Sequence, residues 1–206
     1  YERLLSEKTN NGRLSNIDLL LPVVEFRVSM FAGVNFGQFK RINLHVIFSD
    51  DLSPAVIKSQ FLNTLQQSYK LAPGTEGATW SGVVTMDSLV DLGASIKSNV
   101  PPEQLVNYGS DLLEGFRILN LDEDALIGKL EGNSFLKGKY LLAVGKTEWD
   151  SLKWSDSSIS SKKDIINKAD LVFVASESVE KYKTAKEKLS SQSVNDLLLD
   201  CSDAHY

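Results

Sequence analysis

The sequence predicts an α/β fold in which parallel strands are covered by helices on both faces. Residues 140–144 and 171–175 are continuous apolar runs of strand length, and 197–199 is a third, shorter run. Segments with helical periodicity separate these runs. Because buried parallel strands read as unbroken apolar runs and alternate with helices, this pattern predicts a parallel sheet in the last third of the chain.

Two further strands are predicted nearer the N-terminus, at 19–28 and 42–48. The second strand alternates, with Ile, Leu, Val and Phe on one face and His45 on the other. A single histidine in such a strand is usually a hydrogen-bonded core residue, and a metal ligand is the alternative. Glu25 lies in the first strand, where a buried carboxylate is unfavourable unless it is paired or bound to metal. Arg27 shares its face and is the ion-pair partner that the sequence offers.

The middle of the chain, 71–132, is predicted to be a helical insertion. A helix begins before it at Pro54, and its four-residue apolar spacing continues through Leu65. Residues 71–82 read as a flexible loop because they include a proline and three glycines. Thr85 is expected to cap the next helix.

Further helices are expected in the middle of the chain and between the apolar strands of its last third. Helical stretches are predicted from Pro101, from 121 to 132, from 160 to 168 and from 179 to 189. In 160–168, two adjacent isoleucines are expected to face the core.

The composition is that of a globular, acidic domain. The chain has 206 residues, of which 42% are hydrophobic and 24% charged, with a net charge of −5. This charge supplies no general attraction to nucleic acid or to an anionic membrane, although a local patch or a bound metal ion can override it. The single cysteine, Cys201, excludes an internal disulfide. No apolar run approaches the roughly 20 residues of a membrane-spanning helix. We therefore expect a cytoplasmic domain without membrane contact, cut from a longer chain.

The last predicted strand leads into Ser-Asp-Ala-His, so that Asp203 and His205 follow its carboxyl end. Parallel α/β folds gather their functional residues at this end of the strands. An aspartate and a histidine two residues apart in an extended chain project to the same side, and Zn, Mn and Fe accept this mixture of ligands. The alternative is a polar turn in which Asp203 caps a helix.

Six segments of the chain together resemble the PHP (polymerase and histidinol phosphatase) domain at the N-terminus of TrlF-family AAA-like ATPases. The resemblance covers nearly the whole chain and is weakest between 71 and 132. The segments that carry it are 21–27, 41–50, 138–142, 154–156, 168–173 and 201–205.

The resemblance implies a partial, distorted seven-stranded (β/α) barrel of the PHP type. It would lack its first strands, carry the insertion at 71–132 and occupy 1–206 as one domain. It also implies two or three divalent metal ions (Mn, Zn or Fe) at the carboxyl ends of the strands, and the hydrolysis of phosphoesters. Glu25, His45, Asp203 and His205 match metal ligands of the family, and no further catalytic residue is indicated.

The sequence departs from the family pattern in two places. The family's opening His-x-His belongs before Tyr1, and a histidine usually found on a middle strand has no equivalent in the apolar run 140–144. About half of a metal site is therefore present, and residues 1–206 alone are expected to be weak or inactive. Two functions stay open. One is a metal-dependent phosphoesterase or nuclease module acting on nucleic acid, and the other is a non-catalytic regulatory scaffold. In both, the AAA-like ATPase domain of the same polypeptide is the expected partner.

A barrel without its first strands leaves an unpaired edge, which is an association hazard. The predicted strand at 19–28 borders that edge. We expect it to be covered by 1–16 or to pair with a second copy in a homodimer.

Overall fold

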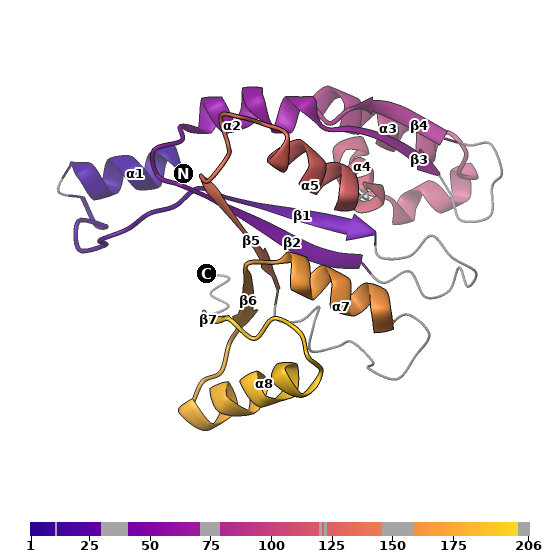
Figure 1. The fold of residues 1–206 in the computed structure, drawn as a ribbon. Coiled ribbons are helices and arrows are strands. Elements are labelled where there is room, and N and C mark those ends of the chain that lie inside the picture. Colours follow the sequence, from indigo (N-terminus) through magenta and orange to yellow (C-terminus); the bar gives the residue numbers. More distant parts are fainter. Residues whose placement is uncertain are drawn as a thin grey trace. The chain divides into compact units, whose positions relative to one another are not determined.

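The structure is a computed structural model that divides into two compact units (Figure 1). The first unit contains Tyr1–Met30, Lys40–Leu52 and Gly138–Tyr206, and the second contains Phe31–Phe39 and Ser53–Lys137. The structure describes residues 1–10, 12–29, 41–70, 79–119, 121, 123–145 and 159–201.

The first unit is built on a five-stranded sheet with the order β1-β2-β5-β6-β7. Together with its helices, this sheet makes the chain a mixed α/β protein, as predicted. Over the described residues the sheet is open, with β1 and β7 at its edges. The strands are β1 (Val23–Ser29), β2 (Arg41–Phe48), β5 (Tyr140–Val144), β6 (Leu171–Val174) and β7 (Leu198–Asp200).

Only the C-terminal part of the sheet is parallel. Strands β5, β6 and β7 pair in parallel, whereas β1 with β2 and β2 with β5 are antiparallel. The expectation of parallel strands is therefore wrong for β1 and β2. A parallel crossover needs a dozen or more residues, and only residues 30–40 separate these two strands. Asp51 follows β2, and Lys139 directly precedes β5. Lys139 donates a hydrogen bond to Asp51 across 2.7 Å and lowers the pKa of that carboxyl group.

One face of the sheet forms the core of the first unit. In β2, Leu44, Val46 and Phe48 are almost completely buried, as the alternation predicts. Their neighbours on the same face are also buried, namely Phe26, Leu142, Val144, Val172 and Val174. The opposite face, which we call the His45 face, carries Glu25, His45, Ala143, Leu171 and Phe173.

Three helices among the described residues belong to the first unit. The crossover helices are α7 (Ile159–Lys168) and α8 (Val179–Ser191), and both predictions are confirmed. Ile165 and Ile166 are buried, as expected. Helix α1 (Glu2–Thr9) is tied to the segment before β1, because Lys8 Nζ donates to the carbonyl oxygen of Asp18 across 2.6 Å. Whether 1–16 or a second copy covers the edge of β1 stays a prediction.

The second unit is not wholly helical. It begins with α2 (Pro54–Gln60), the 3-10 helix η2 (Leu62–Thr64) and an antiparallel hairpin of β3 (Gln66–Lys70) and β4 (Thr79–Val83). It continues with α3 (Met86–Lys97), the 3-10 helix η3 (Pro102–Asn107), α4 (Asp111–Ile118) and α5 (Glu123–Glu131). Strand β4 lies partly in the stretch 71–82 that the sequence assigns to a loop, and residues 71–78 are outside the described part.

The first helix of this unit ends earlier than its apolar spacing predicts. Helix α2 stops at Gln60 and the chain is extended at Leu65, yet Ile57, Phe61 and Leu65 are all buried. The same core is thus reached by a short helix followed by a 3-10 turn. The expected cap of the next helix is confirmed, since Thr85 Oγ1 accepts a hydrogen bond from the Ser88 amide at 3.1 Å.

Helices α3 and α4 approach closely at two glycines. A Cβ atom on Gly93 would lie 1.8 Å from the carbonyl oxygen of Asp111, and one on Gly115 would lie 2.0 Å from that of Leu89. Lys97 and Asp111 add an ion pair of 2.8 Å between the two helices. The glycines therefore set how closely the pair packs.

Candidate metal centre

Glu25 and His45 lie directly opposite each other on β1 and β2. Their Cα atoms are register partners, so both side chains project from the His45 face. Glu25 Oε2 and His45 Nε2 are 3.9 Å apart. The structure therefore places two of the four candidate ligands side by side, and their role as metal ligands stays a prediction.

The distance between these two atoms is close to that of two ligands of one metal ion. It is too long for a hydrogen bond. A carboxylate oxygen and an imidazole nitrogen each bind zinc at about 2.0–2.2 Å, so two ligands of one tetrahedral ion lie about 3.4 Å apart. The observed 3.9 Å is slightly longer. The pair can supply one oxygen and one nitrogen ligand to a divalent cation if the exposed side chain of Glu25 moves closer to His45.

The surroundings of His45 are more apolar than those of Glu25. The side chain of His45 is 19% exposed and that of Glu25 is 54% exposed. Next to His45 on β5 is Ala143, which is fully buried. The imidazole contacts the ring of Phe173 on β6, with ring centroids 5.0 Å apart. A cation at this place would be reached by solvent from the side of Glu25.

The second ring nitrogen of His45 has no hydrogen-bond partner in the described part of the chain. Its Nδ1 atom is buried, which is energetically unfavourable for a polar atom. A histidine that binds metal through one nitrogen usually donates a hydrogen bond from the other. The other nitrogen, Nε2, faces the carboxylate of Glu25. The ring is held by the contact with Phe173 instead.

Asp203 and His205, the other two predicted ligands, lie outside the described residues. Within those residues, no group of three or more His, Cys, Asp and Glu side chains could hold a metal ion. The strand register shows what a site of Glu25, His45, Asp203 and His205 would require of the chain after β7. Val172 pairs with Leu198, so residue 197 is level with His45, and Asp203 is six residues further along. An extended chain covers roughly 20 Å over six residues. Asp203 can reach His45 only if the chain turns back after β7.

The position of the pair along the strands differs from the expectation. Glu25 and His45 were expected at the carboxyl ends of parallel strands, but both lie within their strands. Because β2 is antiparallel to β5, the carboxyl ends of these two strands point in opposite directions. Arg27, the other proposed partner of Glu25, has a side chain outside the described set.

A second polar pair, absent from the sequence-based candidates, lies at the carboxyl ends of β6 and β7. Ser176 is 3% exposed and binds the carboxylate of Asp200 with both its amide and its hydroxyl group. Asp200 is the register partner of Val174 and is itself exposed, and it lies on the opposite face of the sheet from His45. An aspartate at the carboxyl end of a predicted parallel strand was the signal in the sequence that could have identified it.

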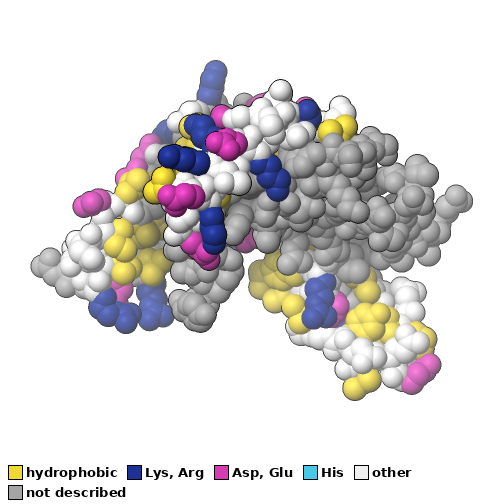
Figure 2. Space-filling model, turned by 90° about the horizontal axis from the view of Figure 1, so that it is seen from below, with side chains coloured by type: hydrophobic (Ala, Val, Ile, Leu, Met, Phe, Trp, Pro, Cys, Tyr) yellow, Lys and Arg dark blue, Asp and Glu magenta, His cyan; other side chains and the backbone are white. Residues whose placement is uncertain are grey.

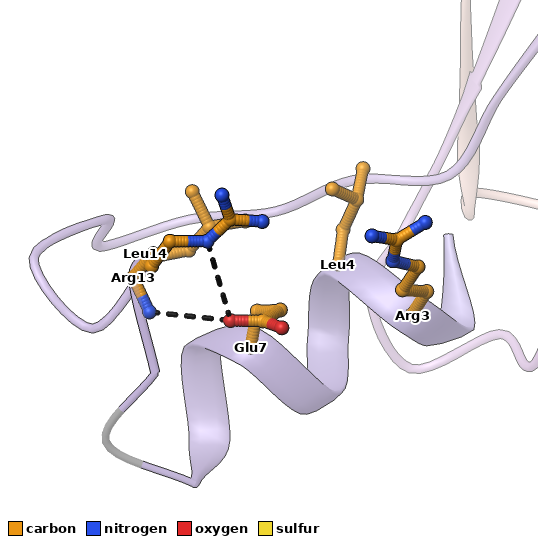
Figure 3. A pocket seen from close by; sticks show the side chains of 5 residues that line it. All are labelled: Arg3, Leu4, Glu7, Arg13 and Leu14. Carbon is orange, nitrogen blue, oxygen red and sulfur yellow. Dashed lines mark hydrogen bonds and ion pairs between the residues drawn. The ribbon is translucent and has the colours of Figure 1, made fainter.

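The hollow lined by Arg3, Leu4, Glu7, Arg13 and Leu14 is a weaker candidate (Figure 3). It is formed by α1 and the loop after it. Glu7 lies between the two arginines and is 3.9 Å from Arg13 Nε, so the hollow has little net charge. On the face in Figure 2, basic and acidic side chains of the described residues are mixed, without a large area of one sign. The described residues of this face therefore form no basic path for a nucleic acid strand.

Comparisons with known proteins do not identify the chain. Among the helices in the described ranges, none is long and apolar enough to cross a membrane. No family model, no curated protein and no solved structure matches this sequence.

Proposed function

We propose that Glu25, His45, Asp203 and His205 bind divalent metal ions (Mn, Zn or Fe) and that the domain hydrolyses phosphoesters. The observation that carries this proposal is the pair of facing side chains, Glu25 Oε2 and His45 Nε2, 3.9 Å apart. The resemblance to the PHP domain of TrlF-family ATPases supplies the reaction. The parallel β5-β6-β7 part supports a partial PHP-type barrel, whereas the antiparallel β1 and β2 differ from one.

Each residue has a role in this proposal. His45 binds through Nε2, the nitrogen that faces Glu25, and the carboxylate of Glu25 supplies negative charge that favours a cation. Ala143 and Phe173 keep water from the inner side of the imidazole. When bound, a divalent ion polarises the phosphoester and lowers the pKa of a bound water. Asp203 and His205 complete the ligand set once the chain after β7 turns back.

Nucleic acid is the favoured substrate, because the family joins this domain to an AAA-like ATPase. The ATPase domain of the same polypeptide is the proposed partner, in the cytoplasm, and the edge of β1 is a proposed contact between two copies. The alternative function is a regulatory scaffold without catalysis. The run 140–144, which has no histidine, favours this alternative.

Manganese binding tests the shared site. Calorimetric titration of the 206-residue chain should show that Glu25→Gln, His45→Ala, Asp203→Asn and His205→Ala each weaken the same binding event by about tenfold or more. The matched control is Glu187→Gln on α8, which removes an exposed carboxylate of the same unit and should bind like wild type. A shared ion also predicts that the double variant His45→Ala/His205→Ala loses less than the sum of the single losses. Wild-type affinity in the Glu25 and His45 variants would refute the shared site.

Activity separates the two functions. The full-length protein with manganese should hydrolyse an aryl phosphodiester or labelled DNA if the domain is an enzyme. The activity should be lost in His45→Ala and kept in Glu187→Gln. Metal binding without turnover in the full-length protein would favour the regulatory scaffold.

A further inference from the structure

The His45 face continues beyond His45 as an apolar surface that extends to β7. Phe173 on β6 is the register partner of Leu199 on β7, so both side chains lie on this face. Leu197 shares the face, because it lies two residues before Leu199 in extended chain. Leu197 is 58% exposed, Leu199 is 44% exposed, and Leu141 on β5 is 45% exposed. Exposed apolar residues that are grouped in this way are typical of a binding surface.

The His45 face changes from charged to apolar between its two edges. Glu25 lies on the edge strand β1, and His45 lies opposite it on β2. Ala143 follows on β5, and then Phe173 on β6, whose ring centroid is 5.0 Å from that of His45. Leu199 lies one strand further, at a strand spacing of about 4.8 Å. The apolar surface therefore begins directly beside the candidate metal pair.

The charge of the chain limits how a phosphoester can gain affinity at this place. Proteins that bind long nucleic acid strands gain most of their affinity from lysine and arginine contacts with phosphates. This chain has a net charge of −5, which does not favour such contacts. A metal ion on one side and apolar contact on the other are the remaining sources of affinity. Aromatic rings are well suited to such contact, because they pack on aromatic and aliphatic side chains.

We propose that Phe173 and Leu199 select phosphoesters in which a flat aromatic ring lies next to the phosphate. With the phosphate at Glu25 and His45, the ring would lie on Phe173 and against Leu199. The ring is that of an aryl ester or of a nucleobase. This inference rests on the proposed function and makes Leu199 a specificity-determining residue, while the ring site itself is formed by β6 and β7.

Two pairs of ligands isolate the contribution of the ring. Phenyl phosphate and methyl phosphate have the same charged group, and so do adenosine monophosphate and ribose 5-phosphate. Their Kd values are measured by calorimetry with the 206-residue chain in the presence of manganese. Leu199→Ser removes the apolar side chain, and Leu199→Met keeps an apolar one. The matched control is Leu113→Ser on α4, because Leu113 is also 44% exposed but belongs to the second unit.

In the wild type, a ligand with the ring should bind at least about fivefold more tightly than its counterpart without the ring. Leu199→Ser should reduce this preference by about threefold or more and leave the Kd of methyl phosphate unchanged. Leu199→Met and Leu113→Ser should both keep the wild-type preference. The pair of ligands with the larger preference identifies the ring as an aryl group or as a nucleobase.

Equal binding of ligands with and without the ring by the wild type would overturn the ring site. The proposed function would survive that result, because methyl phosphate would still bind with manganese. An unchanged preference in Leu199→Ser, or an equal loss of preference in Leu113→Ser, would also overturn the ring site. Absence of manganese-dependent binding of all four ligands would refute the proposed function, and the ring site with it.

Discussion

The imidazole of His45 lies between a carboxylate on β1 and an aromatic ring on β6. Its Nε2 faces Glu25, and its Nδ1 is buried without a hydrogen-bond partner among the described residues. An unsatisfied buried nitrogen lowers stability, while a nitrogen that faces a carboxylate is available to bind a cation. Cation binding therefore favours an imidazole at position 45, whereas folding stability favours a side chain without the unsatisfied nitrogen.

This conflict predicts that His45→Phe stabilises the protein. The substitution removes the unsatisfied nitrogen and keeps an aromatic ring against Phe173, so the free energy of unfolding should rise by about 1 kcal/mol. Urea denaturation measures the change. His45→Ala is the comparison, because it removes the ring contact as well and should lower stability. A clear loss of stability in His45→Phe would mean that Nδ1 has a partner in the folded protein.

At the scale of elements, the glycines of α3 and α4 control how closely the two helices pack. Gly115→Ala should lower the free energy of unfolding by about 1–3 kcal/mol, because its Cβ would meet the carbonyl oxygen of Leu89. Gly128→Ala on α5 is the matched control. A Cβ there has no atom within 4 Å, so the better helix former should add about 0.5–1 kcal/mol. Equal effects of the two substitutions would contradict the close approach.

The elements that the sequence predicted well are those with strong local patterns. Strands β5 and β6 are unbroken apolar runs, and α3 has a capping threonine followed by apolar spacing, so each could be recognised alone. Strand β3 was missed because Gln66, Gln67 and Ser68 are polar and do not alternate, and the strand exists only through its pairing with β4. Helix α2 was predicted too long because a 3-10 turn continues its buried stripe.

Properties that depend on pairing could not be read from one segment. The antiparallel direction of β1 and β2 is not encoded in their alternation, and only the short linker hinted at it. Glu25 and His45 were proposed as ligands of one site, but their facing positions depend on a register that alternation alone does not determine. Similarly, Ser176 and Asp200 are 24 residues apart and meet only because β6 and β7 are neighbours.

At the scale of the whole molecule, each of the two units has its own buried core. The first unit buries Val46 and Val144, and the second buries Leu92 and Leu126. We therefore expect a destabilising substitution in one unit to leave the stability of the other unit unchanged. In Gly115→Ala, amides of α3 and α4 should exchange hydrogen faster, while those of β2 and β5 keep their wild-type protection. Faster exchange in β2 as well would show that the units unfold together.

The pairing of β2 with β5 has a consequence for the order of folding. These strands are neighbours in the sheet, but nearly all of the second unit lies between them in the chain. Closing so long a loop costs entropy, and contacts between distant segments slow folding. If the second unit folds first, it draws its two ends together and shortens the loop that remains to be closed. We expect the local helices of that unit to form early and the five-stranded sheet to be completed last.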